Sequence, residues 1–330
     1  MSRVARADHW GVTLEDLPPC HREGLFGSDG LMTDVELPFW QWRFEDNPFG
    51  SQIVVARDGR GRLVAVMATQ ISPVWIGERS AGAALLAMHR FHGDFHSPRR
   101  RYELSIALTE LLIERLRERD VAMLYWYPEP ADDRPGQKFL KHDAVRLVNP
   151  ISVDSAALAR LIPGGTARIV SFEEVSSGLD ALWQRAHAEL GVTIVRSTEY
   201  FAWRYAAHPT HQYRFFVIDG ADGELEAAAV VHRKPGHDRA EIVDWLVPVE
   251  AREVGLRLAG GIAAWAAEAG ASRLDAWFCE SSPYFQAAQE VGFRLEPGTR
   301  LLVARPLMRT LGIEMLRVCW NLVLGDLPER

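Results

Sequence analysis

The feature that most constrains the fold of this chain is an internal repeat of long period. Residues 39–59, FWQWRFEDNPFGSQIVVARDG, align without gaps with residues 200–220, YFAWRYAAHPTHQYRFFVIDG. The identical pairs are Trp42/Trp203, Arg43/Arg204, Pro48/Pro209, Asp58/Asp219 and Gly59/Gly220. Each copy predicts an aromatic-rich helix, a proline that ends it, a strand, a DG turn and a second strand. The repeated Trp-Arg pair by itself indicates helix packing, so it serves as evidence for the topology of the chain.

The two copies then continue in the same order of elements. In the first copy the patterns predict strands over 63–77 and 80–95, a helix over 105–120 and a buried strand over 121–128. In the second copy they predict strands over 224–234 and 240–247, a helix over 254–270, a strand over 272–280 and a helix over 282–293 in which Gly292 takes the left-handed conformation. Both halves therefore predict a mixed α/β layer. We expect one domain in residues 1–155 and a second in residues 156–330.

Composition excludes several classes of protein. A chain of 330 residues with 48% hydrophobic side chains is long enough to bury two ordinary cores. Its net charge of -7 gives no excess of positive charge for general nucleic-acid binding. Three cysteines without CxxC spacing indicate neither a disulfide framework nor a cysteine zinc site. No apolar run reaches the roughly 20 residues that span a bilayer, and charges occupy the N-terminus, so we expect a cytoplasmic protein without membrane contact.

The repeated helix and the order of elements resemble the GCN5-related N-acetyltransferase (GNAT) superfamily. The likeness is strongest to bacterial tandem members, whose first helix carries a WRY-x-NP stretch, and it covers roughly residues 30–300 by element order. The C-terminal segment CWNLVLGDLPER is similar to the WxLTxGDxD tail of the same proteins. The resemblance implies a layered α/β fold of two tandem domains. Each would hold a mixed, mostly antiparallel sheet, with splayed parallel central strands flanked by helices.

The resemblance also implies a donor site for acetyl-CoA or another acyl-CoA. In the family the pantetheine arm lies between the splayed fourth and fifth strands as an extra pseudo-strand. The pyrophosphate meets the N-terminus of the next helix through a Q/R-x-x-G-x-G/A loop. The second copy keeps Arg252 and Gly255 of this loop, whereas Arg257 stands where a small residue is expected. The donor residues implied for the second domain are Leu246, Val247, Arg252, Val254, Gly255 and Arg257.

The first copy departs further from the loop pattern. Arg99, Arg100 and Arg101 supply positive charge, but Ser105 or Leu104 replaces the glycine, and Glu103 adds a negative group. We therefore expect the first domain to be degenerate and to support the acceptor pocket, while the second binds the donor.

Amide formation from an ammonium and a thioester needs a base for the amine, a group that polarises the carbonyl and an acid for the thiolate. In the family, a carboxylate on the fourth strand and a tyrosine at the start of the helix after the fifth strand commonly serve as base and acid. Asp244 and Tyr284 occupy these positions, with Glu241 and Glu280 as further candidates. The alternatives are a strand carboxylate paired with an arginine for Asp244 and a packing role for Tyr284.

A histidine cluster in the first copy has a spacing that is compatible with metal ligation. It contains His89, His92, Asp94 and His96. Alternation along a strand places His89 and His92 on opposite faces, so we expect no metal site here. A base role for Asp94 or His92 in a first active site stays open.

The sequence thus predicts an N-acyltransferase that moves an acyl group from acyl-CoA to an amine of a small molecule. Two alternatives remain at this point. One is an enzyme of the same fold whose donor is an aminoacyl-tRNA or a carrier-protein thioester, bound through an arginine patch such as 99–101. The other is a non-catalytic tandem module that binds a metabolite or a protein. Oligomeric state and acceptor identity are not encoded in any motif that we find.

Overall fold

The computed structural model describes residues 11–27, 30–33, 36–128, 137, 140–163 and 167–327. The chain forms two compact units, and neither is a continuous half of the sequence. Unit 1 consists of Met1–Pro73, Ala81–Val145 and Leu302–Ile313, and unit 2 consists of Val74–Ser80, Arg146–Leu301 and Glu314–Arg330. The division at residue 155 into two domains stays a prediction.

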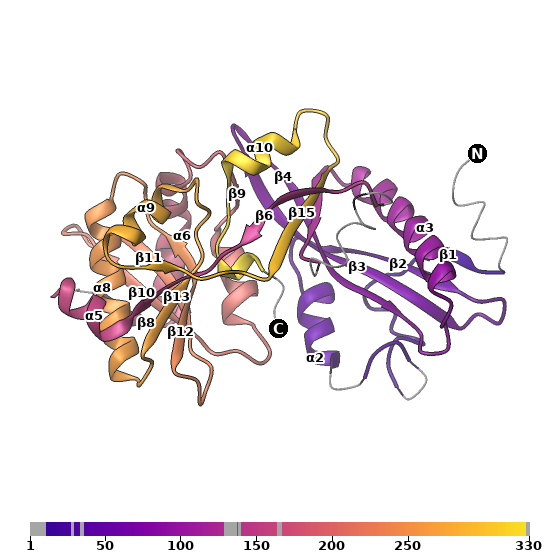
Figure 1. Cartoon of the computed structure of the whole chain (residues 1–330), viewed down its shortest axis with the longest axis horizontal. Coiled ribbons are helices and arrows are strands. Elements are labelled where there is room, and N and C mark those ends of the chain that lie inside the picture. The colour runs from indigo at the N-terminus through magenta and orange to yellow at the C-terminus, as the bar shows by residue number, and fades with distance from the viewer. Residues whose placement is uncertain are drawn as a thin grey trace. The chain divides into compact units, whose positions relative to one another are not determined.

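Unit 1 is built around a mixed sheet with the strand order β1-β2-β3-β4-β5-β15-β6 (Figure 1). Its elements are β1 (Thr13–Asp16), α2 (Leu37–Trp40), η3 (Gln41–Glu45), β2 (Ser51–Arg57), β3 (Leu63–Ile76), β4 (Arg79–Phe91), α3 (Pro98–Arg117), β5 (Val121–Trp126), β6 (Asp143–Val148) and β15 (Arg300–Pro306). The long helix α3 packs on β2 and β5. Strands β2 to β4 and helix α3 follow the order that the first copy predicts, whereas β1 lies before that copy and was not predicted.

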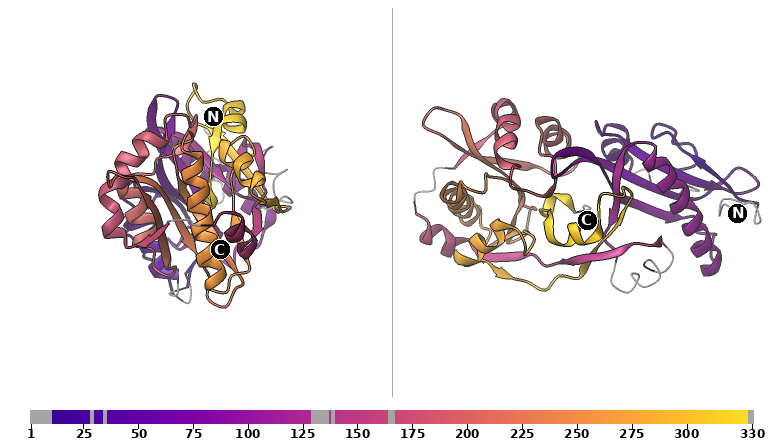
Figure 2. Two further views of the ribbon diagram at one scale, coloured as in Figure 1. Left: turned by 90° about the vertical axis from the view of Figure 1, so that its left-hand side faces the viewer. Right: turned by 90° about the horizontal axis from the view of Figure 1, so that it is seen from above.

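Unit 2 holds a second mixed sheet with the strand order β14-β7-β13-β12-β11-β10-β8. The strands of this sheet are β7 (Ile151–Asp154), β8 (Arg168–Val170), β10 (Tyr213–Asp219), β11 (Leu225–His232), β12 (Arg239–Leu246), β13 (Arg273–Ala276) and β14 (Arg294–Leu295). Unit 2 also contains β9 (Val192–Ile194) and β16 (Trp320–Asn321), which pair with each other outside this sheet, and β9 pairs with the end of β3. Its helices are α5 (Ser155–Leu161), α6 (Phe172–Ala186), α7 (Thr198–Phe201), η5 (Ala202–Ala206), α8 (Arg252–Glu268), α9 (Pro283–Glu290), α10 (Ile313–Cys319) and η6 (Leu324–Asp326). Helices α6 and α8 cover this sheet from its two faces (Figure 2). The mixed α/β class and the layered architecture are therefore confirmed.

The repeated Trp-Arg segments fold alike. In each copy a short α-helix, α2 or α7, continues directly into a π-helical turn, η3 or η5. Trp42 and Arg43 lie in the first π turn, Trp203 and Arg204 in the second, and all four side chains are buried. The predicted helices are thus confirmed, with a wider turn that the sequence pattern did not reveal. Such turns recur at functional sites.

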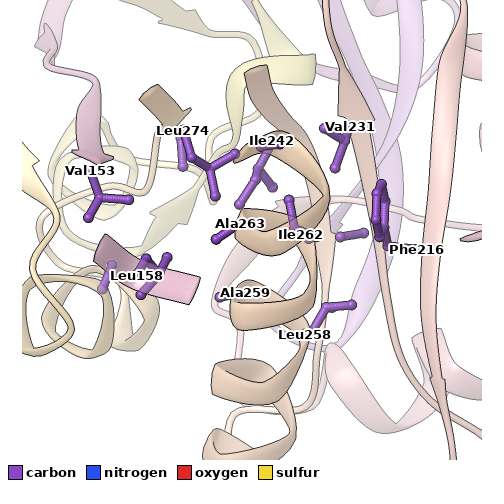
Figure 3. Close-up of a cluster of buried hydrophobic side chains, with 14 of the residues drawn as sticks. Val153, Leu158, Phe216, Val231, Ile242, Leu258, Ala259, Ile262, Ala263 and Leu274 are labelled. Carbon is purple, nitrogen blue, oxygen red and sulfur yellow. The ribbon is translucent and has the colours of Figure 1, made fainter. Parts of the chain in front are cut away.

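The core of unit 2 lies between the sheet and α8 (Figure 3). Alternate residues of the strands, such as Phe216, Val231 and Ile242, face Leu258 and Ile262 of the helix, as period-2 and period-3.6 patterns require.

Two adjacent glycines let α8 approach the chain beside α5. A Cβ atom on Gly260 would lie 2.9 Å from Ile162, and one on Gly261 would lie 2.5 Å from Ala167. Helix α8 and the segment that follows α5 are therefore in backbone contact that larger residues would prevent.

Each sheet contains one parallel pair whose strands part. In unit 2, β12 and β13 pair from Arg239 to Glu241, after which β12 runs on without β13 to Leu246. Val243 is an extra residue in β12, because Asp244 and Ile242 pair with the neighbours Val230 and Val231 of β11. This bulge bends the strand at the point of parting.

The same division occurs in unit 1, where β4 and β5 pair as far as Leu85 and Tyr125 while β4 continues to Phe91. The splayed parallel strands implied by the resemblance are therefore confirmed in both units.

Each sheet is completed by a strand that the repeat pattern would assign to the other copy. Strand β7 follows β6 in the chain but pairs with β13, and β15 follows β14 but pairs with β5. In the part of the chain that the structure describes, no helix combines the length and apolar character needed to cross a membrane.

Candidate functional site

A cavity of about 260 Å³ opens in unit 2 where β12 and β13 part. It lies between the end of β12, the first turns of α8 and helix α9. Its lining is mostly apolar and consists of Ile242, Trp245, Val247, Pro248, Val249, Arg252, Gly255, Leu256, Ala259, Phe278, Pro283, Tyr284, Gln286, Ala287, Ala288, Val291 and Phe293. A concave apolar site with a few polar groups at its edge is the usual form of a small-molecule pocket.

The N-terminus of α8 borders this cavity without a side-chain cap. The residue before the helix is Ala251, which has no side-chain acceptor for the N–H groups of the first turn. The first N–H with a helical partner is that of Gly255, which donates to Ala251 O at 3.0 Å. Free N–H groups and the positive end of the helix dipole favour an anion at this place.

Gly255 is buried in the cavity wall, and its lack of a side chain matters there. A Cβ atom would lie 3.3 Å from Cζ2 of Trp245 and 3.4 Å from Cγ1 of Val247. Any larger residue would therefore push into the space between α8 and the end of β12.

The two arginines of the predicted loop face different neighbours. Arg252 lines the cavity and forms an ion pair with Glu290 of α9. Arg257 points toward β11, where its Nη2 lies 3.6 Å from Oε2 of Glu226, and it is absent from the lining formed by the described residues. Val254 packs half-buried against the core under α8.

The end of β12 forms the opposite wall. Leu246 is buried and pairs with Ala228 of β11, on the side away from β13. Val247 follows it and contributes its side chain to the cavity. These two residues therefore lie along the unpaired edge, as the resemblance implies.

Tyr284 lies at the start of α9, where Ser282 caps its backbone N–H, and its ring lines the cavity. Its hydroxyl donates to Val247 O at 2.5 Å. Burial, together with the negative charges of Glu250 and Glu189, raises the pKa of Tyr284 above its ordinary value. The phenol is thus a neutral proton donor at physiological pH.

Asp244 is completely buried, and donors engage both of its carboxylate oxygens. Nε of Arg196 lies 3.1 and 3.2 Å from them, the hydroxyl of Tyr205 donates at 2.5 Å, and the N–H of Trp245 donates at 2.8 Å. Asp244 does not line the cavity. These contacts agree with the alternative of a strand carboxylate paired with an arginine, and the base role stays a prediction.

Arg196 joins Asp244 to the C-terminal tail. Its Nη2 donates to both oxygens of Asp326 at 2.8 and 2.9 Å, while Arg204 donates to Gly325 O at 2.8 Å. Burial alone would lower the pKa of Arg196, but the two carboxylates outweigh it and hold the pKa well above its ordinary value. Gly325 and Asp326 of the tail, which the sequence analysis noted only through the resemblance, therefore hold the tail against β12.

The further acidic candidates lie away from the cavity. Oε2 of Glu241 is 3.7 Å from Nδ1 of His232, and Glu280 accepts from Nδ2 of Asn149 at 3.2 Å and lies 3.8 Å from Arg146.

In unit 1 the first turn of α3 is already capped. The hydroxyl of Ser97 accepts from the N–H of Arg100 at 3.4 Å. Arg99 pairs with Glu103 at 3.1 Å, and Arg101 donates to the carbonyl of Phe95. Arg99, Arg101 and Glu103, which the sequence placed near a first phosphate loop, thus bind groups of their own unit.

The histidine cluster of unit 1 is spread out. Nε2 of His89 lies 3.3 Å from the hydroxyl of Ser105, while Nδ1 of His92 lies 3.6 Å from Asp94, which also pairs with Arg62 at 2.9 Å. Within the described ranges, no three histidine, cysteine or acidic side chains gather as metal ligands do.

Comparison with known proteins identifies the fold. No family model matches the sequence, and no curated protein sequence does either. A probable N-acyltransferase from Enterococcus faecalis matches at a TM-score of 0.65 with 13% identity, over 90% of this chain and 72% of that one. A tandem GNAT protein from the clavulanic acid biosynthesis pathway matches at 0.54 with 15% identity, over 90% and 99%. The chain has the tandem GNAT fold.

A third solved structure widens the range of donors within this fold. It is N-myristoyltransferase from Saccharomyces cerevisiae with bound myristoyl-CoA, which matches at a TM-score of 0.54 with 11% identity, over 82% of this chain and 70% of that one. At such identities the likeness establishes the fold, and the chemistry of this GNAT-fold protein must be argued from its own residues.

Proposed function

We propose that this protein is an acyl-CoA-dependent N-acyltransferase whose donor site is the cavity of unit 2. The observation that carries the proposal is the position of the cavity. It lies where a parallel strand pair parts, and it ends on a helix N-terminus without a side-chain cap. An extended amide-containing arm with a pyrophosphate at one end has the chemistry to fill both parts.

Three of the six predicted donor residues line the cavity, namely Val247, Arg252 and Gly255. In the proposed complex the pantetheine arm follows the unpaired edge at Leu246 and Val247, and the pyrophosphate meets the first turn of α8. Val254 contributes a backbone N–H of that turn. Arg257 remains a prediction, since it must leave Glu226 to reach a phosphate.

In the proposed reaction, the nitrogen of a neutral amine attacks the thioester carbonyl carbon. A C–N bond forms, the C–S bond breaks, and the amine loses one proton while the CoA thiolate gains one. Tyr284 suits the proton donor because its neutral phenol lines the cavity. We propose that Asp244 acts by holding Trp245 and the end of β12 in place, since its oxygens are engaged by Arg196 and Tyr205.

We propose a small-molecule amine as the acceptor. An acyl-CoA donor is an intracellular metabolite, which also fits the predicted cytoplasmic location. A carrier-protein or aminoacyl-tRNA donor, and a non-catalytic binding module, are the alternatives that the first experiment separates from this proposal.

That experiment is calorimetric titration of the purified protein with acetyl-CoA and CoA. Gly255→Asp places bulk and negative charge against the pyrophosphate position, so its affinity for both ligands should fall by about 100-fold or more. The matched control is Arg100→Asp, which places the same carboxylate in the first turn of α3 in unit 1, with a net change of two charges instead of one, and should leave affinity unchanged.

Loss of binding in Arg100→Asp alone would move the donor site to unit 1. No binding of either ligand to the wild-type protein would reject an acyl-CoA donor and favour the macromolecular donors or a non-catalytic role.

A further inference from the structure

A second, smaller pocket lies on the α6 side of the unit 2 sheet, whereas the donor cavity lies on the α8 side. Its volume is about 20 Å³, which holds roughly one water-sized group. It borders Trp245 and Leu246, which belong to the unpaired stretch of β12 along which the pantetheine arm is proposed to run. A group seated in this pocket would therefore approach that arm from the face of the sheet opposite α8.

Four aromatic side chains form much of the pocket wall, namely Trp183, Trp245, Phe278 and Tyr284. They come from α6, the end of β12, the segment after β13 and the start of α9. The faces of aromatic rings attract cations, and pockets lined by several rings bind alkylammonium groups in other proteins. A methyl group would fit such rings as well, so the polar walls decide between the two.

The polar walls offer oxygen atoms that lack a hydrogen-bond partner. Thr193 is 4% exposed, and its hydroxyl forms no hydrogen bond among the described residues. The amide nitrogen of Asn321 donates to Cys319 O at 3.1 Å, which leaves the amide oxygen free within the same part of the chain. Thr193 and Asn321 are partners in the pairing of β9 with β16, so their side chains share one face. Because buried polar groups are nearly always paired, the two oxygens suit a ligand that carries N–H groups.

The charges around the pocket also favour a cation. Arg196 lines the pocket, but the two carboxylates that flank its guanidinium balance the positive charge. The pKa of Tyr284 is raised by burial and by the negative charges of Glu250 and Glu189, two residues without an ion-pair partner in the described chain. The field that acts on this wall would attract an ammonium group and repel a carboxylate.

We infer that this pocket seats the amino group of the acceptor, bound as a primary ammonium between the aromatic rings and the oxygens of Thr193 and Asn321. The inference deepens the proposed function and rests on it. A space for one water-sized group admits –NH3+ but no trimethylammonium group, so the pocket selects unsubstituted amino groups. The rest of the acceptor leaves past Asn321, which is partly exposed. The bound ammonium passes one proton to water, and the neutral nitrogen then attacks the thioester.

The test is titration of the wild-type protein with n-butylamine, n-butyltrimethylammonium and butyrate at constant ionic strength, followed by tryptophan fluorescence. At about pH 7 the alkylamine is protonated, as a lysine side chain is. It should bind at least about 10-fold more tightly than either of the other probes, because one is too large and the other has the wrong charge. Equal binding of n-butyltrimethylammonium or of butyrate would overturn the inference, and so would a failure of n-butylamine to bind.

The first variant is Thr193→Val, which removes the hydroxyl and keeps the branched shape of the side chain. It should weaken binding of n-butylamine by about 10-fold, as the loss of a hydrogen bond to a charged group does. Its affinity for CoA should not change, since Thr193 lies outside the donor-cavity lining formed by the described residues. The matched control is Thr69→Val, which alters a buried threonine of β3 in unit 1 and should leave both affinities unchanged. The same loss of amine binding in both variants, or in neither, would overturn the role of Thr193.

CoA binding separates this inference from the proposed function. A wild-type protein that binds CoA but not n-butylamine would keep its donor site, and the inference alone would fail. A protein that binds n-butylamine with the expected selectivity but does not bind CoA would keep the ammonium pocket, while the proposed function and the acceptor role that rests on it would both fail.

Discussion

Both units contain a wedge, which is the gap between two parallel strands that part, but they differ in the helix that follows it. In each, a parallel strand pair parts after a few residues and a long helix follows, α3 in unit 1 and α8 in unit 2. The first turn of α3 is capped by the hydroxyl of Ser97, whereas Ala251 leaves the first turn of α8 without a side-chain cap. One residue before a helix thus decides whether its N–H groups are used within the protein or are left for a ligand.

The units also differ in how charges hold them together. In unit 2, Arg196 is buried between Asp244 and Asp326. Pairs of unit 1 such as Arg115–Asp16, with an N–O distance of 2.6 Å, lie partly exposed. Buried pairs become very costly when one partner is lost, while exposed pairs contribute little.

The largest effect is therefore expected for Arg196→Met. It leaves two carboxylates buried without their common partner, which should lower the free energy of unfolding by about 3–5 kcal/mol. The control Arg115→Met should change it by about 1 kcal/mol or less. Urea unfolding followed by tryptophan fluorescence measures both. Equal effects of the two variants would contradict the difference between the units.

The second prediction uses cysteines as probes of each unit. Cys20 of unit 1 is exposed, and Cys279 of unit 2, three residues after the end of β13, is buried. Burial raises the pKa of the Cys279 thiol from about 9 to about 11. At pH 8 its thiolate fraction is therefore about 100-fold lower than that of a thiol with the ordinary pKa. Thiol labelling of the native protein at pH 8, followed by mass spectrometry, should modify Cys20 at least that much faster.

The sign of the accompanying stability effect follows from the same shift. The unfolded thiol ionises first, so the unfolded state binds fewer protons and stability should fall as the pH rises from about 9 to about 11. Comparable labelling rates for Cys20 and Cys279 would mean that the surroundings of Cys279 open readily, and would contradict its burial in a closed core.

Much of this fold was predictable because its determinants are local. The repeated Trp-Arg segment, the alternating strands and the helix caps fixed the order of elements, and Gly292 takes the predicted left-handed conformation with φ of 102°. The exchange of β7 and β15 was not predictable, since by pattern alone either strand could pair with β5 or with β13. Long-range pairing decides it.

The site was predictable in part for the same reason. Gly255 and Tyr284 line one cavity, because a helix start and a strand end bring them together, while their roles stay predictions. The partners of Asp244 and the outward turn of Arg257 depend on residues far along the chain, such as Arg196 and Glu226. Trp245 also lines the cavity, and its buried N–H without a partner is a feature that only the folded structure reveals.

The smallest predicted effect tests the comparison most directly, by exchanging the caps. Ser97→Ala removes the acceptor for the N–H of Arg100 and should lower stability by about 1 kcal/mol, with no change in affinity for CoA. Ala251→Ser gives α8 the cap that α3 has, so it should add up to about 1 kcal/mol of stability while its hydroxyl competes with the pyrophosphate for the same N–H groups. Affinity for CoA should then fall by a few fold. Thermal unfolding and calorimetric titration on the two variants measure both quantities. Opposite signs for stability and affinity in Ala251→Ser are the decisive result, because general damage to the fold would lower both. A variant that gains stability and keeps its full affinity would show that the first turn of α8 does not hold the donor.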